Sequence, residues 1–251
     1  MSFNIKKWVI LVAILILPFL LYYIWVYNVK EVFFQSLEYA GPAEITDEGD
    51  TIPYSIPHFD GFLNQNGTPV DRSFFEGKIT VVNFFFTTCP SVCGPMNFQL
   101  KDQIYDRFKH LDDFRILSFT VDPEKDTLEA LKAYGLELGV KERTPTIWNF
   151  VRGDKEKTYA LANAFLLSAM EDEMAPGGFL HSEMLVLVDW EGRIRSRINE
   201  QGNLMGVYNS LELLEVKDMV DDIKVLKAEL EKDRSKREYE EEKAAKEAKK
   251  N

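Results

Sequence analysis

The hydrophobic positions near the start of this chain form one unbroken run. Residues 8–27 contain no charged side chain and match the ~20 residues that a helix needs to cross a bilayer. The run ends in tyrosine and tryptophan, as membrane interfaces favour, and lacks the small residues of a cleavage site. Lys6 and Lys7 precede it, so the positive-inside rule keeps the N-terminus in the cytoplasm. Residues 1–30 are therefore predicted to be an uncleaved transmembrane anchor.

The pattern changes after this run. Residues 31–52 show little periodicity and are predicted to be a linker, while residues 53–228 are predicted to fold as one domain. Asn66-Gly67 is typical of a hairpin turn. Residues 78–86 are a continuous run of β-branched and aromatic side chains, which predicts a strand buried on both faces. Apolar residues then recur at helical spacing from Met96 onward.

Strand and helix patterns alternate through the rest of the domain. Asp126 opens a capping-box sequence and is predicted to cap the helix that follows. The expected elements are strand 114–121, helix 128–134, strand 147–151, helix 159–166, a loop over 171–178, a hairpin of 183–188 with 193–198, and a final helix from about 210. Parallel crossings followed by an antiparallel hairpin and a helix predict an α/β, thioredoxin-like fold.

The C-terminal tail, residues 229–251, consists almost entirely of charged residues and alanine. Charges at i, i+4 spacing predict a solvated helix or a disordered tail, with a docking role as the alternative. The net charge of the chain is −11, which argues against nucleic acid as a partner because phosphate recognition requires clustered Lys and Arg.

Cys89 and Cys93 are the only cysteines, and both fall on the predicted strand-to-helix turn. Helix N-termini stabilise thiolates, so a lowered thiol pKa is expected there. Three interpretations remain open. The first is a structural disulfide, which would close a very small loop and stabilise little. The second is thiol–disulfide exchange, although that chemistry usually employs Cys-x-x-Cys on this fold and this chain has one more residue between the cysteines. The third is metal binding, because two thiolates one helical turn apart can bind a soft ion such as Cu(I).

A copper site needs a ligand beyond two sulfurs, and the chain has three histidines. His110 falls on the polar face of the helix after the cysteines, and His58 precedes the predicted domain. His181 follows a glycine-rich loop at the entry to a strand, and in a thioredoxin-like fold this connection faces the cysteine turn. His181 is therefore the favoured candidate, whereas Met96 is expected to pack in the core.

Three segments together resemble the signature sequences of the Sco/SenC copper chaperone family. They are Phe84-Phe85-Phe86-Thr87-Thr88-Cys89-Pro90-Ser91-Val92-Cys93, Thr120-Val121-Asp122-Pro123-Glu124-Lys125-Asp126-Thr127 and Gly178-Phe179-Leu180-His181-Ser182-Glu183. The resemblance extends over about residues 52–226. It implies that Cys89, Cys93 and His181 bind copper, and that the protein helps to assemble the binuclear copper centre of cytochrome c oxidase subunit II.

Two segments depart from the family pattern. Gly94 separates Cys93 from Pro95, where the family often has Cys-Pro, and residues 199–203 lack the Asp-Gly-Thr of close relatives. Neither departure touches an implied ligand, although both affect the surface that a partner would meet. Asp122, which follows a strand near the cysteine turn, is expected to act in partner docking or in the electrostatics of the site.

The leading hypothesis is a copper metallochaperone holding Cu(I) or Cu(II) through Cys89, Cys93 and His181. The alternative is a thiol–disulfide oxidoreductase that reduces the cysteines of the oxidase copper site with Cys89 and Cys93 alone. A copper or redox sensor signalling through the tail is a third possibility. Expected partners are oxidase subunit II, other copper chaperones and thiol reductants. The expected location is the periplasmic face of an inner membrane, or else the mitochondrial inner membrane facing the intermembrane space.

Overall fold

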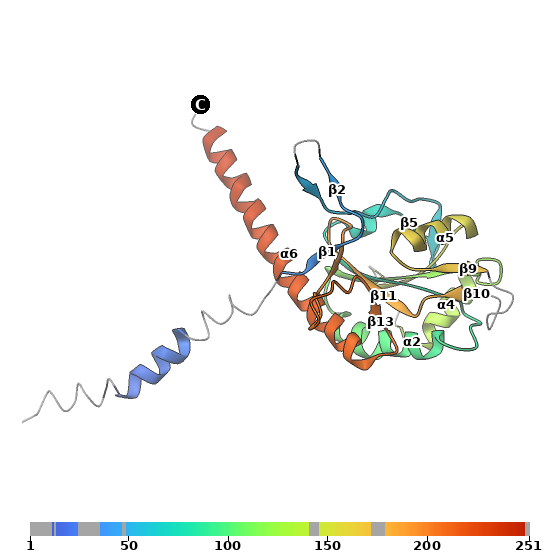
Figure 1. Cartoon of the computed structure of the whole chain (residues 1–251), viewed down its shortest axis with the longest axis horizontal. Coiled ribbons are helices and arrows are strands. Elements are labelled where there is room, and N and C mark those ends of the chain that lie inside the picture. The colour runs from blue at the N-terminus through green and yellow to red at the C-terminus, as the bar shows by residue number, and fades with distance from the viewer. Residues whose placement is uncertain are drawn as a thin grey trace, which may run out of the picture. The chain divides into compact units, whose positions relative to one another are not determined.

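The computed structural model describes residues 12, 14–24, 36–46, 49–140, 146–171 and 179–248 (Figure 1). The chain divides into two compact units between residues 36 and 37. In the first unit, residues 14–24 are helical and their apolar side chains are exposed. The remainder of the predicted span, residues 8–11, 13 and 25–27, lies outside the described residues.

Within the described residues, no helix is both long enough and apolar enough to cross a membrane.

The second unit is built on a nine-stranded mixed sheet with the order β1-β12-β11-β6-β7-β8-β4-β5, and β13 also pairs with β11. Its strands are β1 (Glu38–Ala40), β4 (Phe62–Asn64), β5 (Pro69–Val70), β6 (Ile79–Phe85), β7 (Phe114–Thr120), β8 (Trp148–Arg152), β11 (Met184–Val188), β12 (Ile194–Ser196) and β13 (Tyr208–Asn209). Strands β6, β7 and β8 are parallel, and β11 runs antiparallel to β6. All seven residues of β6 are buried, as its continuous apolar sequence predicts.

The remaining elements are short hairpins and helices. The hairpins are β2 (Glu44–Ile45) with β3 (Thr51–Ile52) and β9 (Ala169–Glu171) with β10 (Phe179–His181). The helices are the 3-10 helix η1 (Arg72–Phe75), α2 (Cys93–Gln99), the π-helix η2 (Leu100–Tyr105), α3 (Asp106–Phe108), α4 (Leu128–Glu137), α5 (Lys155–Ala164) and α6 (Leu213–Ala248).

Side-chain alternation along β6 divides the core between the two faces of the sheet. Phe84 stacks on Phe119 at 5.4 Å between ring centroids and meets Phe165, which caps the C-terminus of α5. Phe85 points the other way and packs on Tyr134 of α4 at 5.3 Å. Helices α4 and α5 therefore cover opposite faces, as Figure 1 shows.

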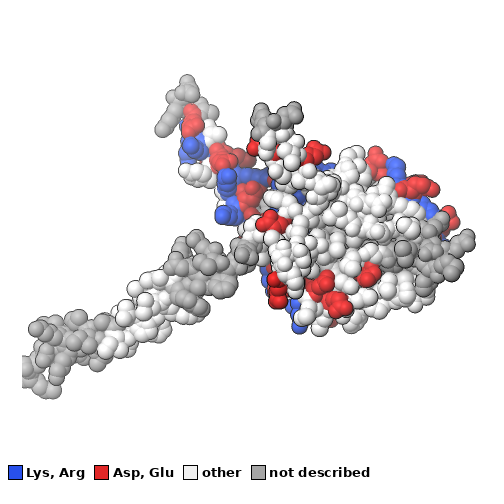
Figure 2. All heavy atoms as spheres, in the orientation of Figure 1, with Lys and Arg blue, Asp and Glu red and all other residues white. Residues whose placement is uncertain are grey.

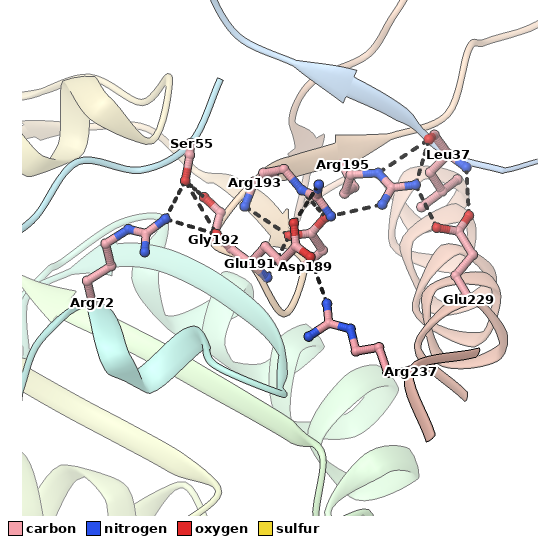
Figure 3. Close-up of polar contacts among 10 residues, drawn as sticks. All are labelled: Leu37, Ser55, Arg72, Asp189, Glu191, Gly192, Arg193, Arg195, Glu229 and Arg237. Carbon is pink, nitrogen blue, oxygen red and sulfur yellow. Dashed lines mark hydrogen bonds and ion pairs between the residues drawn. The ribbon is translucent and has the colours of Figure 1, made fainter. Parts of the chain in front are cut away.

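A buried arginine joins the start of this unit to α6 (Figure 3). Arg195 on β12 is 2% exposed, and its guanidinium contacts Asp189 at 3.2 Å and Glu229 of α6 at 2.7 Å. It also donates to the carbonyl oxygen of Leu37 at 2.8 Å. Further along α6, Arg237 pairs with Glu191 at 3.0 Å. These contacts hold β1, the β11–β12 turn and α6 together.

The sequence predictions need three corrections at this level. Residues 37–40 lie in the predicted linker, yet Leu37 and Ala40 are buried and β1 pairs with β12, so the sheet begins before the predicted boundary at residue 53. Helix α6 continues through the boundary predicted at residue 229, so the tail through residue 248 is the solvated helix that was one of the two alternatives, with both signs of charge along it (Figure 2). The β9–β10 hairpin was not predicted, because only a loop was expected over residues 171–178.

Candidate metal centre

The two cysteines lie where β6 passes into α2. The amide of Cys89 donates to the carbonyl oxygen of Phe86 at 3.3 Å, which tightens the turn, and α2 begins at Cys93. Both cysteines are free thiols. Cys93 is buried, whereas Cys89 is partly exposed and its sulfur lies 3.7 Å from the hydroxyl oxygen of Ser91. One cysteine is thus partly exposed while the other is buried.

The pKa of the Cys93 thiol differs from the sequence prediction. The side-chain hydrogen bond with Cys89 and burial together raise the pKa of Cys93 far above its usual value, and a backbone hydrogen bond at Phe86 opposes them only in part. The expected lowering by the helix N-terminus is wrong for this cysteine, because desolvation and the neighbouring sulfur outweigh the helix dipole. Burial and the neighbouring sulfur therefore favour the protonated form of Cys93.

A buried carboxylate fixes the turn that carries the cysteines. Asp126 is fully buried and accepts from the Thr87 amide at 3.1 Å, from the Thr87 hydroxyl at 2.5 Å and from the Thr120 hydroxyl. The prediction that Asp126 caps α4 is wrong. The N-cap is Thr127, whose hydroxyl accepts from the amide of Ala130 at 3.2 Å, so the Asp126 side chain is left to join the ends of β6 and β7.

His181 is the last residue of β10, and its side chain lies outside what the structure describes. The backbone nevertheless limits where it can be. Val186 pairs with Val82 and Leu187 with Val81 in an antiparallel register, so the start of β11 lies toward the end of β6. The segment that enters β11 and the segment that leaves β6 toward the cysteines therefore reach the same end of the sheet.

The other candidate residues have structural explanations. Met96 is fully buried and its sulfur accepts from the Asn83 side chain at 3.7 Å, which confirms it as a core residue. Asp122 is buried in the turn after β7, where it pairs with the Lys125 ammonium at 3.2 Å. His58 and His110 are exposed. Among the described residues, no group of three His, Cys, Asp or Glu side chains has the arrangement of a metal site.

Sequence reasoning missed the threonines that bind Asp126 and the buried amides behind the cysteines. Thr87 lies two residues after the end of β6 and Thr120 ends β7, so neither stands out by type or spacing. Asn83 did carry a signal, because it is a polar residue inside an otherwise apolar strand. Asn97, fully buried, lies four residues after Cys93 and hence on the same side of α2.

The sheet order and the cysteine turn before α2 define a thioredoxin-like domain of the Sco type, and solved structures of that type share the fold. The SCO1/SenC family model matches residues 54–214. The chain belongs to this family.

The individual relatives have low sequence identity to this chain, but their alignments cover most of both chains. A SCO1 protein homolog of Bacillus subtilis is 24% identical over 176 residues, which span 70% of this chain and 84% of the relative. The structure of BsSco, described as a member of the Sco family of cytochrome c oxidase assembly proteins, aligns with a TM-score of 0.55 and 24% identity over 73% of this chain and 97% of BsSco. ScoI of Bradyrhizobium japonicum with copper bound aligns with a TM-score of 0.52 and 23% identity over 68% and 98% of the two chains. These structural likenesses establish the shared fold.

Proposed function

We propose that this protein is a copper metallochaperone that binds one copper ion through the sulfurs of Cys89 and Cys93 and the imidazole of His181. The observation that carries the proposal is the pair of free cysteines four residues apart in the turn that leads into α2, where Cys93 is buried and Cys89 is partly exposed. Thiolates select Cu(I) over harder ions, and imidazole is also a common copper ligand, so this donor set fits the metal.

The sheet register supports His181 as the third copper ligand. The antiparallel pairing of β11 with β6 directs the backbone that follows His181 to the end of the sheet where the cysteine turn lies. His58 and His110 are less suitable, because each is exposed on a segment that does not adjoin this turn. The copper-bound ScoI structure with the same fold also supports copper as the cargo.

The accessibility of Cys89 supports transfer rather than storage. A copper ion with three protein ligands, one of them at the surface, can be passed on by stepwise ligand exchange. We infer that the acceptor is the binuclear copper site of cytochrome c oxidase subunit II, since relatives of this family are described as oxidase assembly proteins. Other copper chaperones and thiol reductants are further partners, and the apolar run at residues 8–27 would anchor the domain on the periplasmic side of an inner membrane.

A second function uses the same sulfurs. The Cys89 and Cys93 side chains are hydrogen-bonded to each other as free thiols, an arrangement that also suits a dithiol reductant. In that reaction the pair would be oxidised to a disulfide while the disulfide of the oxidase copper site is reduced to two thiols. This function needs both cysteines and has no role for His181.

The experiment is a Cu(I) titration of the reduced full chain in detergent against a competing chelator. We expect one copper per wild-type chain, none in the double variant Cys89→Ser/Cys93→Ser, and much weaker binding in His181→Ala. His58→Ala is the matched control and should bind like wild type. Failure of the wild type to bind copper would refute the chaperone function. Unchanged binding in His181→Ala, together with retained disulfide reduction, would favour the oxidoreductase.

A further inference from the structure

The surface around the cysteine turn carries no charged side chain. Between Lys78 and Lys101 the sequence has no Asp, Glu, Lys or Arg, although 28% of the residues of the whole chain are charged. The first part of this stretch is the buried strand β6, where neutral residues are expected. Residues 87–99 are different, because most of them are exposed or partly exposed. Burial therefore does not explain why this surface segment is uncharged.

Phe98 is the largest exposed apolar side chain of this segment. It lies on α2 and is 61% exposed. Gly94 and Pro95 precede it by four and three positions, so the three residues share the outer face of α2, and all of them are exposed. Five residues separate Phe98 from Cys93, which corresponds to ~7.5 Å along the helix axis. An exposed phenylalanine adds little to the stability of the fold, because it buries little apolar area.

Helix α4 adjoins this part of α2. The Asn97 amide donates to the Tyr134 hydroxyl oxygen at 2.8 Å, and Gly139, which follows α4, lies near the Lys101 side chain. The two helices are therefore in contact over this stretch. Leu136 belongs to the same stretch of α4 and is 54% exposed. Each of the two helices thus exposes one large apolar side chain here.

Copper transfer by ligand exchange determines what covers this surface. In each exchange, a thiol of the acceptor bonds to copper and passes its proton to the sulfur that it displaces, and the copper stays Cu(I). The acceptor must therefore approach Cys89 and Cys93 directly. A protein–protein interface of ordinary size covers roughly 800 Å² of each partner, which is a disc of roughly 16 Å radius. An interface centred on the cysteines thus includes the outer face of α2.

We propose that Phe98 and the uncharged surface around it form the docking surface for the copper acceptor, and that the acceptor meets it with an apolar, uncharged patch beside its own copper ligands. The inference rests on the proposed function, whose site this surface adjoins. A charged patch would lose its hydration here without meeting an opposite charge, which is unfavourable. An aromatic side chain, in contrast, is well suited to the buried centre of an interface.

The test measures Cu(I) transfer from the copper-loaded full chain in detergent to the metal-free soluble domain of oxidase subunit II. Phe98→Glu and Phe98→Lys should each slow transfer about tenfold or more, because either charge removes the apolar contact. Both variants should bind Cu(I) with wild-type affinity and release it to a small chelator at the wild-type rate, since the copper ligands are unchanged. Phe98→Leu, which stays apolar, should retain most of the transfer rate.

Ile45 provides the matched control at the other end of the sheet. It is 77% exposed on β2. Strand pairing through β12 and β11 relates Ala40, which precedes β2, to Thr80 near the start of β6, whereas the cysteines follow the end of β6. Figure 1 also shows β2 and α2 on opposite sides of the domain. Ile45→Glu and Ile45→Lys should therefore transfer copper like wild type.

The outcomes separate this inference from the proposed function. Wild-type transfer in both charged Phe98 variants, or faster transfer with one of the two charges, would overturn the docking surface and leave copper binding by the chain intact. A change in self-association of the chain in place of a change in transfer would assign the surface to a contact between two copies, and the inference would be wrong.

A measurement without metal covers the case in which the wild type binds no copper and the chaperone function fails. Surface plasmon resonance then follows association of the reduced, metal-free chain with the same subunit II domain. Association weakened about tenfold in both charged Phe98 variants would support the docking surface. Equal association in the variants, or no association of the wild type, would refute it.

Discussion

The cysteine turn and the C-terminal helix are both held by buried polar groups, but of different kinds. At the turn, the Asp126 carboxylate accepts only from neutral donors, namely the Thr87 amide and the hydroxyls of Thr87 and Thr120. At α6, the Arg195 guanidinium lies between two carboxylates, those of Asp189 and Glu229 (Figure 3). The first arrangement orients a loop, and the second joins whole elements.

This difference predicts which substitutions affect copper binding as well as stability. Asp126 accepts hydrogen bonds from Thr87, which lies two residues before Cys89. A substitution of Asp126 should therefore displace the cysteine sulfurs as well as lower the stability of the fold. The contacts that Arg195 makes with Leu37, Asp189 and Glu229 lie at the start of β1, in the β11–β12 turn and on α6. Stability and copper binding should therefore separate in variants of Arg195 and change together in variants of Asp126.

The largest loss of stability is expected for Arg195→Met. It removes one cation from the buried Asp189 and one donor each from Glu229 and the Leu37 carbonyl oxygen. Breaking a buried ion pair from one side typically costs about 3–5 kcal/mol of unfolding free energy. Urea unfolding measures the loss, and copper affinity should be unchanged while the chain is folded. Arg237→Met is the control, since its exposed pair with Glu191 should contribute less than about 1 kcal/mol. Equal losses in the two variants would contradict the account.

Asp126→Ala should give the next largest loss, about 3 kcal/mol of unfolding free energy, because it leaves three hydrogen-bond donors without their buried acceptor. Copper affinity should fall in the same variant. Asp154→Ala removes the carboxylate that caps α5 by accepting from the Lys157 amide, and it should cost about 1 kcal/mol with normal copper binding. Normal copper binding by folded Asp126→Ala would show that the turn does not depend on this carboxylate.

The smallest effect is expected from deleting residues 238–251. The ion pairs that α6 forms there, such as Lys246 with Glu242 at 3.3 Å, are exposed and lie within the helix itself. The free energy of unfolding should change by less than about 0.5 kcal/mol, and copper binding should be retained. Loss of oxidase assembly by this truncation, with copper binding intact, would instead support a sensor or docking role for the tail.

The sequence predicted the central strands well because their burial leaves a local pattern. The apolar run of β6 and the Asn66-Gly67 turn between β4 and β5 are confirmed. Strand β1 could not be predicted in the same way, since its three residues are mixed in polarity and its partner β12 lies far along the chain. Burial of Leu37 and Ala40 depends on that distant partner.

The two cysteines of the candidate site could be predicted from the sequence, but the residues that hold the cysteine turn in place could not. Cysteine spacing is visible in a sequence, whereas the choice between Asp126 and Thr127 as the cap of α4 depends on whether another acceptor is needed in the core. The structure resolves it, because two strand ends supply donors that only Asp126 can reach. The buried hydrogen bonds from the Trp148 indole to the Ser118 hydroxyl and from the Asn97 amide to the Tyr134 hydroxyl likewise join residues far apart in the sequence and have no local pattern.

X-ray absorption spectroscopy at the copper edge tests the proposed ligand set most directly. The sample is the reduced full chain loaded with one equivalent of Cu(I), with His181→Ala measured alongside it. The account predicts two sulfur scatterers and one imidazole nitrogen in the wild type, and loss of the imidazole contribution in the variant. A first shell without two sulfurs, or an imidazole signal that survives His181→Ala, would contradict the account.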